Sequence, residues 1–207
     1  MPLYKTITVS PTTTAYIWKI EEDLDTLSHD IKLTAYCQKR VDSMKSILHR
    51  RGFMSVRQLL AIAGYTDHNL FYDNQGKPHL DDGKHISITH SYTFSAIIIS
   101  DRPVGIDIEM QRDKILRIAH KFTPFEQYKT LANTEAIIRK LTIVWGAKES
   151  LYKLYAQEGL SFLKHIDIQD FYFETGQTTG LINYNGVQSS YSLHFLEFEG
   201  FTCVYGY

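Results

Sequence analysis

The 207-residue sequence predicts an α+β protein, because strand-like and helix-like segments follow one another in blocks and do not alternate one by one. Hydrophobic residues make up 43% of the chain and charged residues 22%, as in ordinary globular proteins, which excludes disordered and fibrous classes. The length allows one large domain or two halves of roughly 100 residues each.

The first half begins with two predicted strands. Residues 6–9 and 14–20 are rich in β-branched side chains and alternate between apolar and polar types, a pattern typical of strands. Residues 24–63 repeat apolar side chains at helical spacing, which predicts helices. This helical region carries the basic residues Lys39, Arg40, Lys45, Arg50, Arg51 and Arg57. These residues form either a solvated helical face or a functional surface, and the sequence leaves both interpretations open.

Strands and turns follow. Residues 74–78 contain Asn, Gly and Pro and mark a turn between two strands, and residues 86–91 predict the next strand. Residues 94–100 are almost continuously apolar, so we expect this strand to be covered on both faces. Residues 104–109 alternate strictly between aliphatic and acidic side chains, which predicts a further strand.

The rest of the chain is first helical and then strand-like. Helix patterns cover residues 115–120, 124–131 and 134–155. Residues 166–207 read as short strands separated by glycine-containing turns. These turns are Thr175-Gly176, Asn185-Gly186 and Glu199-Gly200.

Charge and cysteine content narrow the functional classes. The net charge is −1, so no global field attracts nucleic acid. Cys37 and Cys203 belong to no Cys-x-x-Cys motif, which indicates two free thiols in a reducing compartment. No stretch approaches the roughly 18 apolar residues of a membrane span, and residues 1–23 carry early charges unlike a signal peptide. We expect a cytoplasmic protein that binds neither nucleic acid nor membrane.

Two acidic residues lie on one face of a predicted strand. Side chains alternate along a strand, so Asp107 and Glu109 share a face while Ile106 and Ile108 point the other way. Like charges this close disfavour joint ionisation unless a cation compensates them. Oxygen ligands without Cys or His favour Mg²⁺ or a similar ion. The alternative is a polar strand face that meets only solvent.

The predicted helix at 134–155 offers a third carboxylate. Trp145, Glu149, Tyr152 and Lys153 fall on one stripe, with Glu149 and Lys153 four residues apart. An exposed helix with one weak ion pair explains this spacing. Alternatively, Glu149 joins Asp107 and Glu109 in one site and leaves Lys153 free for a phosphate.

Two further residues match no common catalytic motif. His90 precedes the hydroxyl residues Ser91 and Thr93, but no Gly-x-Ser-x-Gly segment supports a hydrolase triad. Lys77 lies in a Gly-Lys-Pro turn that lacks the longer Walker loop, which disfavours hydrolysis of nucleoside triphosphates.

Taken in order, five segments resemble the successive signatures of the 4′-phosphopantetheinyl transferases. The two most specific are Gly-Ile-Asp-Ile-Glu at 105–109 and Trp-x-x-Lys-Glu-x-x-x-Lys at 145–153. The full set is residues 74–80, 86–91, 104–109, 122–126 and 145–153. The resemblance implies transfer of the phosphopantetheine arm of coenzyme A to a serine hydroxyl of an apo acyl or peptidyl carrier protein, with release of adenosine 3′,5′-bisphosphate.

The resemblance also implies roles for individual residues. Asp107, Glu109 and Glu149 would hold Mg²⁺, and Glu149 would accept the serine proton directly or through a metal-bound water. Lys153 would neutralise the phosphate under attack, and His90 would bind a coenzyme A phosphate.

The remaining implied contacts are to the nucleotide. Lys77 and Ser91 would line the nucleotide pocket. Arg57 matches the family's helical Arg-x-Leu-Leu element and, with Arg50 or Arg51, would bind the 3′-phosphate.

The length matches the larger, surfactin-type class of this family, in which two similar α/β halves are fused. We therefore expect halves at residues 1–100 and 101–207 related by pseudo-twofold symmetry, with coenzyme A in the cleft between them. The first half would supply nucleotide and phosphate contacts and the second the carboxylates. The chain would be a monomer with one active site.

Two alternative functions remain open. The chain could be a catalytically inactive module that binds coenzyme A or a carrier protein, although such a module has no need for three mutually repelling carboxylates. It could also be an unrelated α+β domain, in which case Asp107 and Glu149 would lie far apart.

Overall fold

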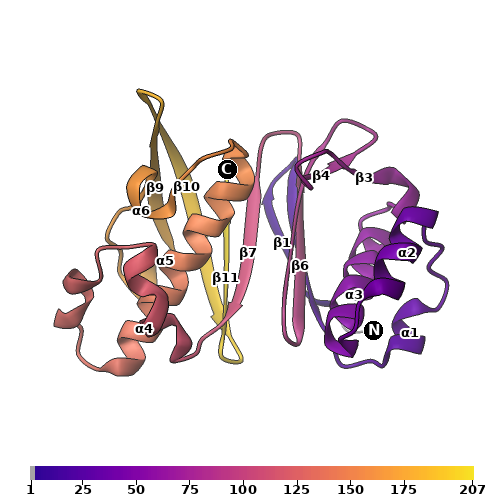
Figure 1. Cartoon of the computed structure of the whole chain (residues 1–207), viewed down its shortest axis with the longest axis horizontal. Helices are drawn as coiled ribbons and strands as arrows, with labels where there is room; N and C mark the ends of the chain where they lie inside the picture. Colours follow the sequence, from indigo (N-terminus) through magenta and orange to yellow (C-terminus); the bar gives the residue numbers. More distant parts are fainter. Residues whose placement is uncertain (1–2) are drawn as a thin grey trace. The chain divides into compact units, whose positions relative to one another are not determined.

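The computed structural model describes residues 3–207, which divide into two compact units between Pro103 and Val104 (Figure 1). Each unit combines one antiparallel sheet with helices, so the expected α+β class is confirmed. Within residues 3–207, no helix is both long and apolar enough to cross a membrane.

The first unit is a six-stranded sheet with three helices. The sheet order is β1-β2-β6-β5-β4-β3. The strands are β1 Leu3–Ser10, β2 Thr13–Lys19, β3 Leu70–Tyr72, β4 Pro78–Leu80, β5 His85–Ser91 and β6 Phe94–Ser100. The helices are α1 Leu24–Ser28, α2 Ala35–Ser43 and α3 Ile47–Ile62, with a 3₁₀ turn at Asp67–Asn69.

Helix α3 is the main helix of the first unit. It begins after Ser46, whose hydroxyl accepts a hydrogen bond from the His49 N–H, a typical N-cap. Its buried residues include Phe53, Leu59 and Leu60, which join the hydrophobic core, and the helix packs on β6, β2 and β5. All seven residues of β6 are buried, as its continuous apolar pattern predicted.

The second unit is a five-stranded sheet with three helices. The sheet order is β7-β11-β10-β9-β8. The strands are β7 Gly105–Met110, β8 Ile166–Ile168, β9 Gln177–Tyr184, β10 Val187–Phe198 and β11 Phe201–Gly206. The helices are α4 Lys114–Ile118, α5 Thr134–Tyr155 and α6 Phe162–His165, with 3₁₀ turns at Ala119–Lys121, Phe125–Thr130 and Phe173–Thr175. The predicted helix at 124–131 is therefore a 3₁₀ turn, which follows Pro124 and ends before the N-cap of α5.

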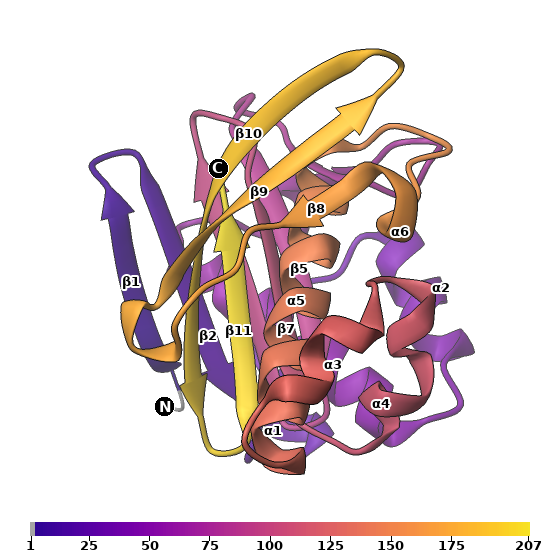
Figure 2. The same cartoon turned by 90° about the vertical axis from the view of Figure 1, so that its left-hand side faces the viewer.

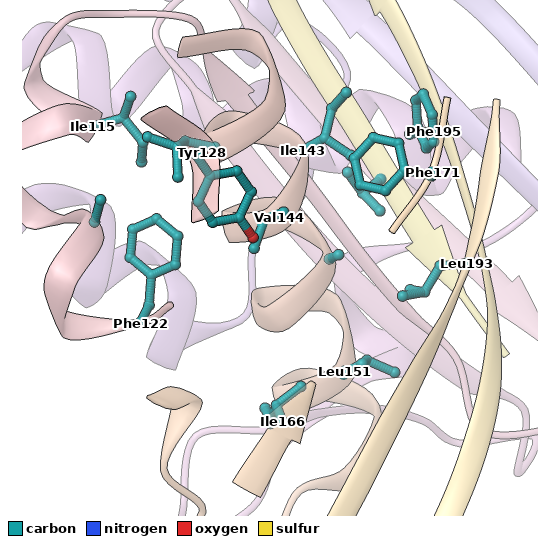
Figure 3. Close-up of a cluster of buried hydrophobic side chains, with 14 of the residues drawn as sticks. Ile115, Phe122, Tyr128, Ile143, Val144, Leu151, Ile166, Phe171, Leu193 and Phe195 are labelled. Atoms are coloured by element: carbon teal, nitrogen blue, oxygen red, sulfur yellow. The ribbon is translucent and has the colours of Figure 1, made fainter. Parts of the chain in front are cut away.

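Helix α5 is the centre of the second unit. The Asn133 side chain caps it by accepting from the Ala136 N–H at 2.9 Å. Its side chains Ile143, Val144 and Leu151 belong to a hydrophobic core that also contains Leu193 and Phe195 of β10 (Figure 3). In Figure 2 the strands of this sheet lie in front of α5, with the long β9–β10 hairpin at the top.

One glycine allows β7 to lie against α5. A Cβ atom on Gly105 would come within 1.9 Å of the Ser150 carbonyl oxygen, which is backbone and cannot move aside. Only glycine permits this close approach. Gly105 thereby fixes the spacing between the strand that carries Asp107 and the helix that carries Glu149.

The two units share one strand order. If β1 is set aside, the order β2-β6-β5-β4-β3 of the first sheet corresponds strand for strand to β7-β11-β10-β9-β8 of the second. In both units the longest helix lies between the first and second strands of this shared set along the chain. The units are therefore similar in topology, and the pseudo-twofold relation between them stays a prediction.

Candidate active site

Strand β7 presents the two predicted carboxylates. Asp107 lies opposite Val204 and Glu109 opposite Thr202 in the antiparallel pairing with β11. Asp107 is only 5% exposed, whereas Glu109 is half-buried. A buried carboxylate needs a charged or hydrogen-bonding partner, so a merely solvated strand face does not account for Asp107.

Lys153 on α5 provides such a partner. Its ammonium donates to Oδ1 of Asp107 at 2.7 Å and to the carbonyl oxygen of Ile106 at 3.0 Å. An ammonium has three N–H donors, and these bonds use two of them. The helical spacing left open a pair between Lys153 and Glu149 or a Lys153 free for a phosphate. The structure pairs Lys153 with Asp107, because α5 packs across β7.

Glu149 lies in the same electrostatic neighbourhood. Burial raises the pKa of Glu149 to about 7, and the negative charges of Asp107 and Glu109 add to the rise, while the Lys153 ammonium opposes it. Asp107 has the larger effect of the two carboxylates. The three acidic residues therefore act on one another, unlike the separated residues of an unrelated domain.

Asp107, Glu109 and Glu149 have the ligand chemistry that Mg²⁺ prefers, but their side chains do not converge on one point. Over residues 3–207, no three His, Cys, Asp or Glu side chains converge closely enough to hold a metal ion. All three candidate ligands are nevertheless carboxylates, the donors that Mg²⁺ prefers. A cation would relieve the repulsion by Asp107 and Glu109, which adds to the effect of burial on the pKa of Glu149. The metal-binding role of these residues stays a prediction.

An apolar pocket borders Glu149. It has a volume of about 460 Å³ and is lined by Ile118, Lys121, Phe122, Trp145, Glu149 and Phe162. The Trp145 ring contacts Phe122 at a centroid distance of 5.0 Å and Phe162 at 5.4 Å. Trp145 also lines a smaller pocket of about 200 Å³ that contains Glu109. This apolar wall is one source of the burial that shifts the pKa of Glu149.

The corresponding positions of the first unit carry aromatic residues. The hairpins β5–β6 and β10–β11 both have two-residue loops, which aligns Ile97 with Val204 and Ser95 with Thr202. Tyr16 lies opposite Ile97 and Trp18 opposite Ser95. Asp107 and Glu109 therefore correspond to Tyr16 and Trp18, so the acidic pair occurs in one unit only.

His90 of the first unit packs over α3. A Cβ atom on Gly52 would come within 2.6 Å of Cδ2 of the His90 ring, so Gly52 makes the space that this ring occupies. The His49 ring lies at a centroid distance of 6.4 Å from it. His90 is exposed and Ser91, the last residue of β5, is half-buried.

Lys77 lies in a turn that Asp73 organises. Oδ1 of Asp73 accepts from the backbone N–H groups of Gln75 and Lys77, both at 2.9 Å, and Oδ2 lies 2.9 Å from Nε2 of His79. Burial lowers the pKa of the Lys77 ammonium, and the Asp73 charge opposes this effect. Lys77 is thus half-buried in an ordered turn.

Arg57 is part of the core and not of an open site. It is 3% exposed, and its Nε donates to Oδ1 of Asp67 at 3.0 Å. Its guanidinium also contacts Cys37 Sγ at 3.2 Å and lies 3.5 Å from the centroid of the Phe53 ring. A buried guanidinium with these partners is a poor phosphate ligand, so we leave Arg57 out of the proposed site.

The neighbouring arginines are more accessible. Arg50 is half-buried, and its Nε donates to the Met44 carbonyl oxygen at 2.7 Å. Arg51 is also half-buried and donates to the Ile20 carbonyl oxygen at 3.0 Å. Both guanidinium groups have further donors, so both remain candidates for the 3′-phosphate.

Sequence reasoning gave no role to two buried lysines on α5, although Lys148 belongs to the Trp-x-x-Lys-Glu-x-x-x-Lys motif. Lys148 donates to the carbonyl oxygens of Phe162 and Ile166, and Lys140 donates to Asp170 and to the Phe171 carbonyl oxygen. Burial lowers the pKa of the Lys148 ammonium to about 8, and the charge of Asp167 opposes this. A signal was present, because both lysines share a helix face with the apolar Val144.

Comparison with known proteins points to one family. The family model described as 4′-phosphopantetheinyl transferase superfamily matches residues 103–205, which include β7 and α5. The chain is also 27% identical over 168 residues to the 4′-phosphopantetheinyl transferase gsp of Aneurinibacillus migulanus. That alignment covers 78% of this chain and 68% of the relative.

Proposed function

Because the chain belongs to the 4′-phosphopantetheinyl transferase superfamily, we propose that it transfers the 4′-phosphopantetheine group of coenzyme A to a serine hydroxyl of an apo acyl or peptidyl carrier protein. Adenosine 3′,5′-bisphosphate is the leaving product. The observation that carries this proposal is the grouping of Asp107, Glu149 and Lys153 on β7 and α5, inside the segment that matches the family model.

Glu149 is the proposed base for the serine proton. A general base works best when its pKa lies near the working pH, and burial beside Asp107 raises the pKa of Glu149 to about 7. The apolar pocket beside Glu149 keeps this carboxylate partly out of water. Without a bound cation Glu149 therefore exchanges a proton near neutral pH, and beside a bound cation its ionised, proton-accepting form would be favoured.

Lys153 is the proposed partner of the phosphate under attack. Hydrogen bonds to Asp107 and to the Ile106 carbonyl oxygen fix the position of its ammonium. These two bonds leave the third N–H donor for a phosphate oxygen. A positive charge held in place stabilises the negative charge that develops on phosphate oxygens in the transition state.

Asp107, Glu109 and Glu149 are the proposed ligands of Mg²⁺. When bound there, Mg²⁺ neutralises charge on the pyrophosphate of coenzyme A and orients it. The supporting observation is the acidic neighbourhood of Glu149, whose pKa is raised first by burial and then by the negative charges of Asp107 and Glu109.

The first unit supplies the proposed contacts to coenzyme A. His90 binds a phosphate and Lys77 and Ser91 contact the nucleotide, while Arg50 or Arg51 binds the 3′-phosphate. The exposed ring of His90, its place over Gly52 and the ordered turn around Lys77 support these roles. The proposal thus divides the work between residues 1–100 and residues 101–207.

We further propose a cytoplasmic monomer with one active site per chain. The acidic pair occurs in one unit, and aromatic residues occupy the corresponding positions of the other. Cys37 and Cys203 are both buried free thiols, which suits a reducing compartment.

The decisive experiment is incubation with coenzyme A, Mg²⁺ and a panel of apo carrier proteins, followed by mass spectrometry of the carriers. We expect the addition of one phosphopantetheine group to a serine. No gain on any carrier, while a known transferase modifies the same panel, would contradict the proposal. Binding of coenzyme A or of a carrier without transfer would identify an inactive binding module instead.

A further inference from the structure

Two buried lysines fasten the segment after α5 to the helix. Lys140 is 6% exposed and Lys148 is 3% exposed. The Lys148 ammonium donates to the carbonyl oxygens of Phe162 at 2.7 Å and Ile166 at 2.5 Å. The Lys140 ammonium donates to Asp170 at 2.7 Å and to the Phe171 carbonyl oxygen. Each lysine therefore holds a different part of residues 162–171.

Stability alone does not explain a lysine at position 148. A buried ammonium loses its hydration, and an apolar side chain of similar length would avoid this cost. What an apolar side chain lacks is donors, and Lys148 uses two of them on carbonyl groups at the two ends of α6. Lys148 therefore fixes α6 in one position relative to α5.

The position of α6 determines the wall of the pocket beside Glu149. Phe162 is the first residue of α6 and lines this pocket. Its ring contacts Trp145 at a centroid distance of 5.4 Å and Tyr152 at 5.5 Å. These two residues lie about one helical turn before and one turn after Glu149. A shift of Phe162 therefore changes the packing around Glu149.

The residues that Lys140 contacts line pockets that do not contain Glu149. Asp170 and Phe171 line two pockets of about 590 and 400 Å³, and neither pocket contains Glu149 or Phe162. Lys140 and Lys148 are thus a matched pair on one helix, with the same chemistry and different neighbours.

We propose that Lys148 is a positioning residue for the transfer reaction, which acts through the Phe162 carbonyl group to hold the apolar wall against Glu149. The proposal rests on the proposed function, in which Glu149 takes the serine proton. Lys148 itself does not touch either substrate. Misplacement of a reacting group by about 1 Å can cost a factor of about 100 in rate, so a loosened wall lowers turnover.

The first test compares Lys148→Met with Lys140→Met, since methionine keeps the unbranched shape and removes the donors. We expect kcat of Lys148→Met to fall about tenfold while the KM for coenzyme A stays within about twofold of wild type. Lys140→Met keeps kcat within about twofold of wild type. Equal losses of kcat in both variants would overturn the proposal, because they would indicate general loosening of residues 162–171.

The second test asks whether Lys148 acts through Phe162. Phe162→Ala alters the wall directly, and we expect its kcat to fall as in Lys148→Met. If both act on the same wall, the double variant is no slower than the slower single variant. Fully multiplied losses would overturn the proposal. If Lys148→Met does not fold, Phe162→Ala still tests whether the wall at Phe162 affects kcat, and an unchanged kcat in Phe162→Ala would overturn the proposal.

A third readout needs no activity. In a Trp18→Phe background, Trp145 is the remaining tryptophan, and we expect Lys148→Met to shift its emission to the red and increase quenching by acrylamide. Lys140→Met should leave both unchanged. Unchanged Trp145 signals in Lys148→Met would overturn the proposal. If wild type transfers to no carrier, the proposed function fails, while this readout still tests the contact.

Discussion

The Lys153 ammonium lies 2.7 Å from Oδ1 of Asp107 and joins the longest helix of the second unit to the strand that carries the acidic pair. The Asp107 side chain is 7% exposed and that of Lys153 28%, so water screens this ion pair only in part. The same lysine therefore has a structural partner and a proposed phosphate partner.

Lys153→Met should abolish transfer and also lower stability. The variant leaves a buried Asp107 carboxylate without its cation, which costs about 3 kcal/mol of unfolding free energy. Urea unfolding measures the stability loss, and mass spectrometry of a carrier measures transfer. Lys164→Met, at an exposed position of α6, is the control and should change neither quantity. Wild-type transfer by Lys153→Met would contradict its role at the phosphate.

Glu149→Gln should abolish transfer and remove a pH dependence of stability. The pKa of Glu149 is raised from 4.5 to about 7, so the folded state holds this proton more tightly than the unfolded chain. Stability from this group is complete below pH 4.5 and is lost as the pH rises through 7.

The measurement for Glu149→Gln is urea unfolding at pH 4.5 and pH 8 without divalent cations. We expect the variant to be more stable than wild type at pH 8, by on the order of 2 kcal/mol, and the difference to vanish at pH 4.5. Mg²⁺ at pH 8 should stabilise wild type more than the variant. A pH-independent difference would contradict the burial of Glu149 beside Asp107.

Local sequence patterns predicted most of the fold. The turns at Thr175-Gly176, Asn185-Gly186 and Glu199-Gly200 separate the strands of the second sheet as expected. Each has a glycine with a positive φ angle, and Asn185 and Glu199 before two of these glycines also have positive φ. The four-residue helix α6 was not predicted. Its first residue, Phe162, accepts a hydrogen bond from Lys148, which lies 14 residues earlier in the chain, and local propensity carries no information on such a contact.

The sequence predicted which residues belong to the candidate site better than it predicted which of them contact one another. The spacing of α5 allowed a Glu149–Lys153 pair or a Lys153 free for a phosphate, and neither alternative included the contact with Asp107, 46 residues away. A four-residue helical spacing describes neighbours on one helix, but a buried carboxylate on β7 competes for the same ammonium. Similarly, the Arg57 motif did not reveal that Asp67 and Phe53 enclose its side chain.

Gly52→Ala should weaken coenzyme A binding without loss of stability. The added Cβ would lie 2.6 Å from Cδ2 of His90 and must displace the ring, which is the end of a movable side chain. Alanine favours the helix by about 1 kcal/mol over glycine, which offsets the crowding. Calorimetry should show an affinity for coenzyme A about tenfold lower, as in His90→Ala.

The control for Gly52→Ala is Gly105→Ala in the second unit. There the added Cβ meets the Ser150 carbonyl oxygen at 1.9 Å, so we expect a loss of stability instead of a selective loss of binding. Unchanged affinity of Gly52→Ala for coenzyme A, with His90 displaced, would contradict a phosphate-binding role of His90.

Arg57→Met should lower stability without affecting recognition of the 3′-phosphate. Burial alone would raise the pKa of Asp67, but the Thr34 N–H and the Arg57 charge lower it, so this carboxylate stays ionised and loses its cation in the variant. Removal of one partner of a buried ion pair costs about 3–5 kcal/mol, which urea unfolding would detect.

Recognition of the 3′-phosphate is measured by the ratio of kcat/KM for coenzyme A to that for 3′-dephospho-coenzyme A. Arg57→Met should keep this ratio, because its guanidinium is enclosed by Asp67 and Phe53. Arg50→Met or Arg51→Met should lower the ratio about tenfold, since one charge-assisted contact to phosphate is lost. A lowered ratio in Arg57→Met alone would instead mean that Arg57 leaves its partner Asp67 to bind the substrate, and would return it to the site.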